Sequence, residues 1–338
     1  MEKSARWLLA ILIISFTMSP TVYGCSSSAA AATPGEAEQA DTQAYGLPLL
    51  PPVSLRGGEK LKVVATTSIV ADVVGHVGGD RIELKVLVPV GTDPHSFEPT
   101  PRDIAAVSDA HVVFANGAGL EEFLEPLLQN AGEKEQVVHA STGIELRQVE
   151  AEEGAEREQG HQHGGDPHTW TDPNNVIVWT HNIEHALSTL DPAGAETYAT
   201  KAQAYRAALE DLDAWIEQQI AQLPETDRKI VTDHATWGYF SERYGFEMVG
   251  AVIPGYSTLS EPSARELAEL QDGIRNLGVK AVFVGNTVNP GLAQRVADDT
   301  GARLVFLYTG SLSEPDGPAS SYLEFMQYNV SQMVSALK

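Results

Sequence analysis

The stretch 191–224, DPAGAETYATKAQAYRAALEDLDAWIEQQIAQLP, decides the architecture of this chain. Its apolar residues recur at intervals of three and four, which predicts a helix with one buried face. Asp191 and Pro192 are typical of a helix start, and Pro224 marks its end. At 1.5 Å per residue this helix would be roughly 45 Å long, which exceeds the width of a small domain. We therefore expect the segment to link two halves of the molecule.

The segments on either side of this helix alternate between strand-like and helical patterns. The alternation predicts an α/β fold with two lobes, 59–190 and 225–338, each a mainly parallel sheet flanked by helices. Open α/β sheets bind ligands beyond the carboxyl ends of their strands, so we expect a site in the cleft between the lobes. The expected strands are 61–65, 84–88, 111–116, 229–232, 246–252, 281–284 and 303–308, and the expected helices are 69–77, 120–130, 174–190, 263–277 and 290–300.

The first 24 residues have the features of an export signal, since Lys3 and Arg6 precede an apolar run at 7–18. That run is shorter than the roughly 20 residues of a spanning helix, so we expect it to be removed. Glycine followed by Cys25 resembles a lipobox, in which the thiol is acylated; an ordinary secretory signal with an incidental cysteine is the alternative. The stretch 25–58 is rich in small and polar residues and predicts a flexible tether between lipid and folded body.

The charge of the chain restricts its partners. It has 46 acidic and 22 basic residues, for a net charge of −24. Nucleic-acid phosphates would be repelled, which disfavours a nucleic-acid partner. An acidic surface attracts cations instead.

Three histidines lie in loops of similar sequence: His95 in DPHSFEP, His168 in DPHTW and His234 in TDHA. His95 and His234 follow expected strands, so folding can bring all three rings to one place. Three neutral imidazoles together form a metal site that suits zinc, copper, nickel or iron, whereas manganese, magnesium and calcium prefer carboxylate oxygens. The alternative is that each histidine is an ordinary surface or core residue with a hydrogen-bond partner.

The motifs GTDPHSFEPTP (91–101), DPHTWTDPNN (166–175) and HATWGYF (234–240) resemble those of the metal-binding solute-binding lipoproteins of bacterial ABC importers for zinc and manganese. The likeness extends from residue 61 to the end of the chain. It implies two α/β lobes joined by one long helix, with a metal ion held between them by His95, His168 and His234. Manganese members generally carry a carboxylate at the third position, so His234 is similar to the zinc subgroup.

The resemblance also implies a function. A membrane-anchored, extracytoplasmic monomer would bind a divalent transition metal with high affinity, Zn²⁺ rather than Mn²⁺, and deliver it to an ABC permease and its ATPase. The acidic segment 150–165, which contains His161 and His163, resembles the flexible His-rich loop of zinc members and would collect zinc beside the main site. A solvated loop with two incidental histidines is the alternative.

The chain departs from the family pattern in its second half. The family usually has Thr-Asp-Ser after the last strand and Phe-Val-Glu after the preceding one, but this chain has TGS at 309–311 and FVG at 283–285. We therefore expect a three-histidine site whose fourth position holds water, chloride or another carboxylate, with Glu98, Glu261 and Asp316 as candidates. Such a site would release its metal faster or suit a different metal. Asp233 and Glu98 are the expected partners that orient the ligand rings.

Two other functions could use the same residues. An open three-histidine zinc could activate water for hydrolysis, and HNIEH at 181–185 fits the pattern of inverted zinc peptidases. Helical spacing places His181 and His185 opposite the apolar face around Ile183, so we expect both to face solvent. We therefore predict a binding protein and not an enzyme. A zinc chaperone or adhesin on the same scaffold is the remaining alternative.

Overall fold

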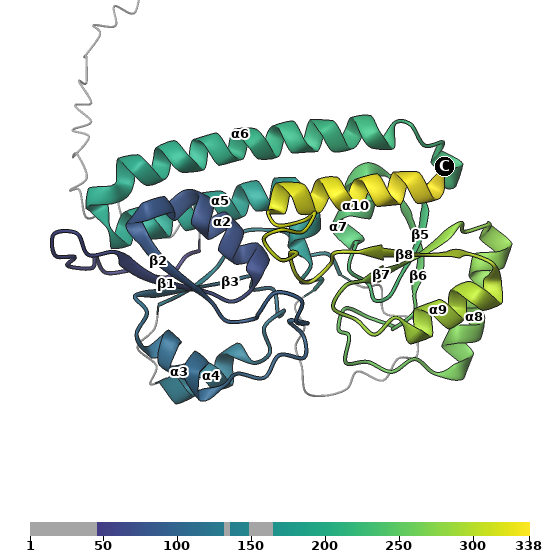
Figure 1. Cartoon of the computed structure of the whole chain (residues 1–338), viewed down its shortest axis with the longest axis horizontal. Helices are drawn as coiled ribbons and strands as arrows, with labels where there is room; N and C mark the ends of the chain where they lie inside the picture. The colour runs from purple at the N-terminus through teal and green to yellow at the C-terminus, as the bar shows by residue number, and fades with distance from the viewer. Residues whose placement is uncertain (1–45, 132–135, 149–164) are drawn as a thin grey trace, which may run out of the picture.

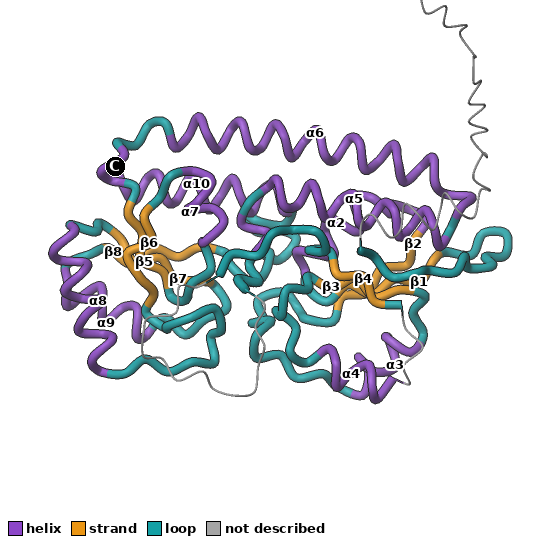
Figure 2. The backbone as a smooth tube through the Cα atoms, turned by 180° about the vertical axis from the view of Figure 1, so that it is seen from behind, coloured by secondary structure: helices purple, strands orange, loops and turns teal. Residues whose placement is uncertain are grey.

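The computed structural model describes residues 46–131, 136–148 and 165–338. Two lobes lie side by side beneath one long helix, α6 (Ala195–Ile220), which spans both of them (Figure 1). Figure 2 shows the same arrangement from behind, with a separate group of strands in each lobe. Within the described ranges, no helix is both long and apolar enough to cross a bilayer.

The N-terminal lobe contains a parallel sheet with the strand order β2-β1-β3-β4. Its strands are β1 (Leu61–Ala65), β2 (Ile82–Val86), β3 (Val112–Ala115) and β4 (Val137–His139). Helices α2 (Ser68–Gly78) and α5 (Pro173–Leu190) lie on the face of the sheet toward α6, and α3 (Pro101–Ser108) and α4 (Leu124–Ala131) lie on the other face.

The C-terminal lobe repeats this plan with the strand order β6-β5-β7-β8, again all parallel. Its strands are β5 (Lys229–Thr232), β6 (Glu247–Ala251), β7 (Ala281–Gly285) and β8 (Arg303–Leu307). Helix α10 (Tyr322–Leu337) lies on the α6 side, while α8 (Ala264–Leu277) and α9 (Gly291–Thr300) cover the opposite face. The short α7 (Gly238–Tyr244) follows β5.

Alternate residues of each central strand enter different cores, as expected for strands buried on both faces. In β1, Val63 joins one large core that extends through both lobes under α6, whereas Val64 joins a smaller core against α3 and α4. In β5, Ile230 joins the large core and Val231 joins a third core against α8 and α9. The two lobes therefore share one continuous hydrophobic layer, which holds them together.

Helix α6 has the buried face that its sequence pattern predicts. Its 26 residues correspond to roughly 39 Å, and it follows a short 3₁₀ turn at Pro192–Gly194. It packs against α2 and α5 of the first lobe and α10 of the second. The buried side chains are Tyr198, Ala202, Tyr205, Leu209, Leu212, Ile216 and Ile220.

Several expected elements need correction. Strand β2 begins two residues earlier than expected because Ile82 pairs with Leu61 of β1 and is buried. Helices α3, α7 and α10 and the three-residue strand β4 were not expected. Within the expected flexible tether, residues 47–53 pack on the first lobe, since Leu47 and Leu50 are buried and the Val53 N–H donates to the Leu190 carbonyl at 2.8 Å. Cys25 and the tether residues 26–45 lie outside the described residues.

Candidate metal centre

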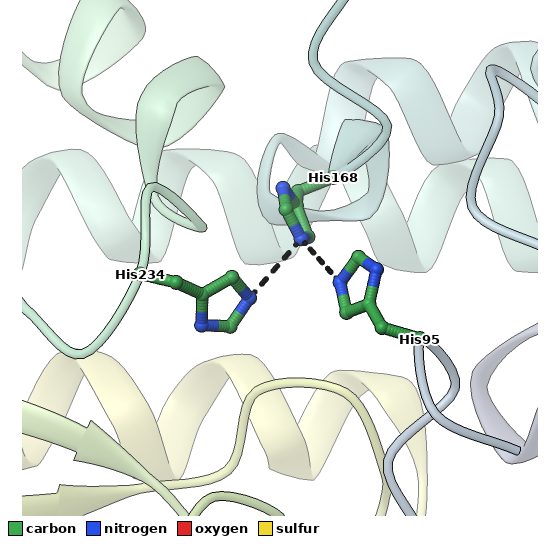
Figure 3. Close-up of side chains that lie close together, drawn as sticks. All are labelled: His95, His168 and His234. Atoms are coloured by element: carbon green, nitrogen blue, oxygen red, sulfur yellow. Dashed lines mark hydrogen bonds between the residues drawn. The ribbon is translucent and has the colours of Figure 1, made fainter. Parts of the chain in front are cut away.

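Each of the three histidines is carried by a loop next to a regular element. His95 lies in the loop between β2 and α3, His168 lies directly before the 3₁₀ turn Thr169–Thr171 that leads into α5, and His234 follows β5. The first two come from the N-terminal lobe and the third from the C-terminal lobe. Figure 3 shows the three rings pointing toward one another across the seam between the lobes.

The ring nitrogens are close enough to share one ion. His168 Nε2 lies 3.2 Å from His95 Nε2 and 3.3 Å from His234 Nε2. One ligand atom from each histidine lies within 4.8 Å of the other two. Nitrogens bound to a tetrahedral zinc at 2.0–2.1 Å lie roughly 3.3 Å apart. The two distances from His168 Nε2 therefore match edges of a zinc tetrahedron, and the third pair of ligand atoms lies within 4.8 Å.

The surroundings of His168 favour the neutral, metal-binding form of its ring. His168 and His234 are buried, at 1% and 3% exposure, and His95 is half-buried. Burial lowers the pKa of His168 well below its ordinary value, and the nearby His234 ring lowers it further. Because a protonated imidazole has no free lone pair, a lowered pKa keeps this ring available to a metal at neutral pH.

Carboxylates orient two of the rings from behind. Asp233 Oδ1 lies 3.0 Å from His234 Nδ1, the arrangement expected from the sequence. Asp166 Oδ1 lies 2.8 Å from His168 Nδ1 and also accepts the His168 N–H at 3.0 Å. Holding Nδ1 in this way directs Nε2 toward the centre of the site. Asp166 was not identified from the sequence, although its place two residues before histidine, like that of Asp93, was a usable signal.

The two buried carboxylates differ in their tendency to ionise. Burial raises the pKa of Asp166 to about 7, despite the opposing His168 N–H and Arg147. Burial also opposes ionisation of Asp233, but the His234 ring and backbone N–H groups keep its pKa below the ordinary value. Its Oδ2 accepts the Gly285 N–H at 2.7 Å.

The two glycines that replace family acids are closely packed. A Cβ at Gly285 would lie 2.1 Å from Thr309 Oγ1 and 2.9 Å from Asp233 Oδ2, so the Asp233 carboxylate occupies space beside Gly285. A Cβ at Gly310 would lie 2.8 Å from Cδ of Pro94, the residue before His95. At either glycine, an added Cβ would therefore require a neighbouring group to shift.

The other predicted site residues are not brought to the centre. Glu98, Glu261 and Asp316 are exposed. Among the described residues, no carboxylate oxygen lies close enough to the three histidine nitrogens to belong to the same cluster. Their assignment as fourth ligands is therefore corrected for this conformation, as is the assignment of Glu98 as an orienting partner, because these loop side chains extend into solvent. His161 and His163 lie outside the described residues. His181 is exposed, and Glu184 pairs with Arg206.

Aromatic side chains close the site on the helical side. The Trp170 ring centroid lies 5.2 Å from that of His168, and its Nε1–H donates across the seam to the Thr309 carbonyl at 3.1 Å. Trp237 and Phe240 are buried and contact each other nearby. Trp170 therefore covers one side of the His168 ring, and Trp237 and Phe240 belong to the large core.

The family model for zinc-uptake complex component A, periplasmic (ZnuA), matches residues 63–336. The chain belongs to this family. Its two-lobe fold with a long linking helix agrees with that of a solved relative, the periplasmic zinc-binding protein TroA from Treponema pallidum. That structure matches with a TM-score of 0.73 and 25% identity, over 82% of this chain and 99% of TroA.

TroA is named for zinc, whereas two relatives with higher sequence identity are named for manganese. The manganese-binding lipoprotein MntA of Halalkalibacterium halodurans is 36% identical over 281 residues, which cover 83% of this chain and 89% of MntA. The manganese ABC transporter substrate-binding lipoprotein PsaA of Streptococcus pneumoniae is 32% identical over 287 residues, covering 83% and 90%. These are substrate-binding proteins, which confirms the prediction of a binding protein over a hydrolase.

Proposed function

We propose that this protein binds a divalent transition metal outside the cytoplasm, Zn²⁺ in preference to Mn²⁺, and delivers it to an ABC permease and its ATPase. The observation that carries the proposal is the group formed by His95, His168 and His234 at the seam of the lobes. Family membership and the names of the relatives support transport as the purpose of this site.

The choice of zinc follows from the donor atoms. Three imidazole nitrogens suit zinc, whereas manganese prefers carboxylate oxygens, and the described part of the site has no carboxylate among its ligand atoms. The 3.2 and 3.3 Å nitrogen spacings suit a small tetrahedral ion. The names MntA and PsaA point to manganese, so the metal must be measured directly.

Competition titrations of the metal-free protein with a chromophoric chelator test this choice. We expect one zinc per chain and an affinity for zinc well above that for manganese. A His168→Ala variant should lose most of this binding. His234→Glu exchanges an imidazole for a carboxylate and should narrow the preference for zinc. A wild-type protein that binds manganese more tightly than zinc would contradict the assignment, and elemental analysis of protein purified without added metal gives an independent answer.

Delivery and anchoring are tested in cells. Cells that lack the protein should accumulate less zinc in zinc-limited medium, and a His168→Ala copy should not restore accumulation. We propose that acylation of Cys25 anchors the protein, as the lipoprotein names of MntA and PsaA support. Cys25→Ser should therefore shift the protein from the membrane fraction to a soluble extracytoplasmic fraction. Unchanged membrane association would contradict acylation at this residue.

A further inference from the structure

The loop that carries His95 is held on two sides by loops of the C-terminal lobe. On one side, the Gly91 N–H donates to Ser311 Oγ at 2.8 Å, and Gly310 lies against Pro94. On the other side, Thr258 Oγ1 donates to Asp93 Oδ2 at 2.5 Å. Movement of the lobes apart must break both sets of contacts.

Asp93 connects the second contact to the histidine itself. Its Oδ1 accepts the His95 N–H at 3.0 Å, and its Oδ2 accepts the hydroxyl of Thr258 and, at 3.3 Å, that of Ser96. The carboxylate therefore shapes the turn before His95 and at the same time reaches across to the other lobe. A hydrogen bond to a carboxylate is stronger than one between neutral groups, so this contact should outweigh the neutral one at Ser311.

Thr258 is itself coupled to the other end of the site. It lies in the loop after β6, and the same loop pairs with the His234 segment through two backbone hydrogen bonds. The Ile253 N–H donates to the Asp233 carbonyl at 2.6 Å, and the Ala235 N–H donates to the Gly255 carbonyl at 2.9 Å. One continuous path of hydrogen bonds and covalent backbone thus runs from His95 to His234, and Asp93–Thr258 is the step that crosses the lobes.

We propose that the Asp93–Thr258 hydrogen bond is a latch that sets the rate of metal release, with Thr258 as a positioning residue for His95. The inference rests on the metal-binding function proposed above. The latch borders a cavity of about 520 Å³ lined by Asp93, Thr258, Glu261 and Thr287 among others, so water can reach it when it opens. Breaking the latch leaves only the contacts at Ser311 and Gly310 to hold the His95 loop on the C-terminal lobe, so the loop can leave more readily and take one imidazole away from the ion.

Stopped-flow measurement of zinc release into excess chelator tests the latch. Thr258→Val keeps the shape of the side chain but removes the hydroxyl, and we expect release about tenfold faster. Thr258→Ser restores the hydroxyl and should return the rate to within about twofold of wild type. The association rate should change far less than the release rate, because the latch acts on an ion that is already bound.

Two controls distinguish a latch from general damage to the cleft. Thr287→Val alters the same cavity wall, and because the described residues show no interlobe hydrogen bond for Thr287, release should be unchanged. In an Asp93→Ala background, Thr258→Val should have no further effect, since each residue acts through the other. Equal release from wild type and Thr258→Val, failure of Thr258→Ser to restore the rate, or equal acceleration by Thr287→Val would each overturn the latch. A wild-type protein that binds no zinc would instead refute the proposed function.

Discussion

Substitution of Gly310 measures what the second lobe contributes to the metal site. A Cβ at this position would lie 2.8 Å from Pro94 Cδ and 3.5 Å from Thr287 Oγ1. The backbone of Gly310 is outside the left-handed region, so the obstacle to a side chain is the proline ring and not the backbone conformation. Because that ring is rigid, even a methyl group must push the His95 loop away from the C-terminal lobe.

The loss of zinc affinity expected for Gly310→Ala follows from this overpacking. Insertion of a methyl into a closely packed interface costs about 1–3 kcal/mol. If the closed arrangement is the one that holds the ion, Gly310→Ala should weaken zinc binding by about 5- to 150-fold. The metal-free protein should unfold at nearly the same temperature, because the lobes can separate slightly without exposing the core beneath α6.

Gly310→Asp adds a carboxylate to the same Cβ. Two unit charges 4 Å apart interact by about 4 kcal/mol at an effective dielectric constant of 20, and the ion carries two charges. This attraction exceeds the packing cost, so the aspartate variant should bind zinc at least tenfold more tightly than the alanine variant and more tightly than wild type.

Chelator competition on wild type, Gly310→Ala and Gly310→Asp at one pH and ionic strength provides the comparison. The alanine variant supplies the steric effect alone, so the difference between the two variants isolates the carboxylate. Equal zinc affinities for wild type and Gly310→Asp would refute the conclusion that the site lacks an anionic ligand from the second lobe. An alanine variant that binds as tightly as wild type would refute the packing estimate.

Three further predictions concern the carboxylate behind His168, the ionisation of His168 and the buried face of α6. Asp166→Asn removes the carboxylate that orients His168 and should weaken zinc binding about 10- to 100-fold by chelator competition, whereas Asp316→Asn, at an exposed position, should have no effect. Because the pKa of His168 is well below 6.5 in the folded protein, its contribution to stability is present above pH 6.5 and lost as the pH falls. Between about pH 7.5 and 5.5, the melting temperature of the metal-free wild type should therefore fall more than that of His168→Gln. Equal decreases would contradict a neutral buried ring. Leu209→Ala in α6 removes a fully buried side chain and should cost about 2–5 kcal/mol in urea unfolding, with zinc stoichiometry unchanged; a cost below about 1 kcal/mol would show that α6 is not part of the shared core.

Local patterns were sufficient for the long, regular elements. The apolar spacing and flanking prolines of 191–224 predict α6 because a helix that buries one face must repeat every 3.6 residues. The capping box Ser263–Glu266 marks the start of α8, which agrees with the helix expected over 263–277. An equivalent capping box at Ser321–Glu324 precedes α10, so the start of this unexpected helix also carries a local signal. Strand β4 has only three residues and depends on its neighbour β3, so its own sequence carries little signal.

Local sequence likewise predicted only some of the site residues. Residue type and loop context single out His95, His168 and His234, and the acid beside His234 was identified as its orienting partner. The candidates for a fourth ligand were wrong for this conformation, because acidic side chains near a motif in sequence can point into solvent. Asp93 and Thr258 are 165 residues apart, and no local pattern relates them.

The amino-acid sequence by itself determined the two-lobe α/β plan, the long linking helix and the three imidazoles, because periodicity and residue chemistry are properties of short segments. Only the tertiary structure decided which groups meet at the seam: Asp166 behind His168, Pro94 against Gly310, and Thr258 on Asp93. Those contacts depend on how the shared core under α6 positions one lobe against the other, and that placement arises from long-range packing of many residues.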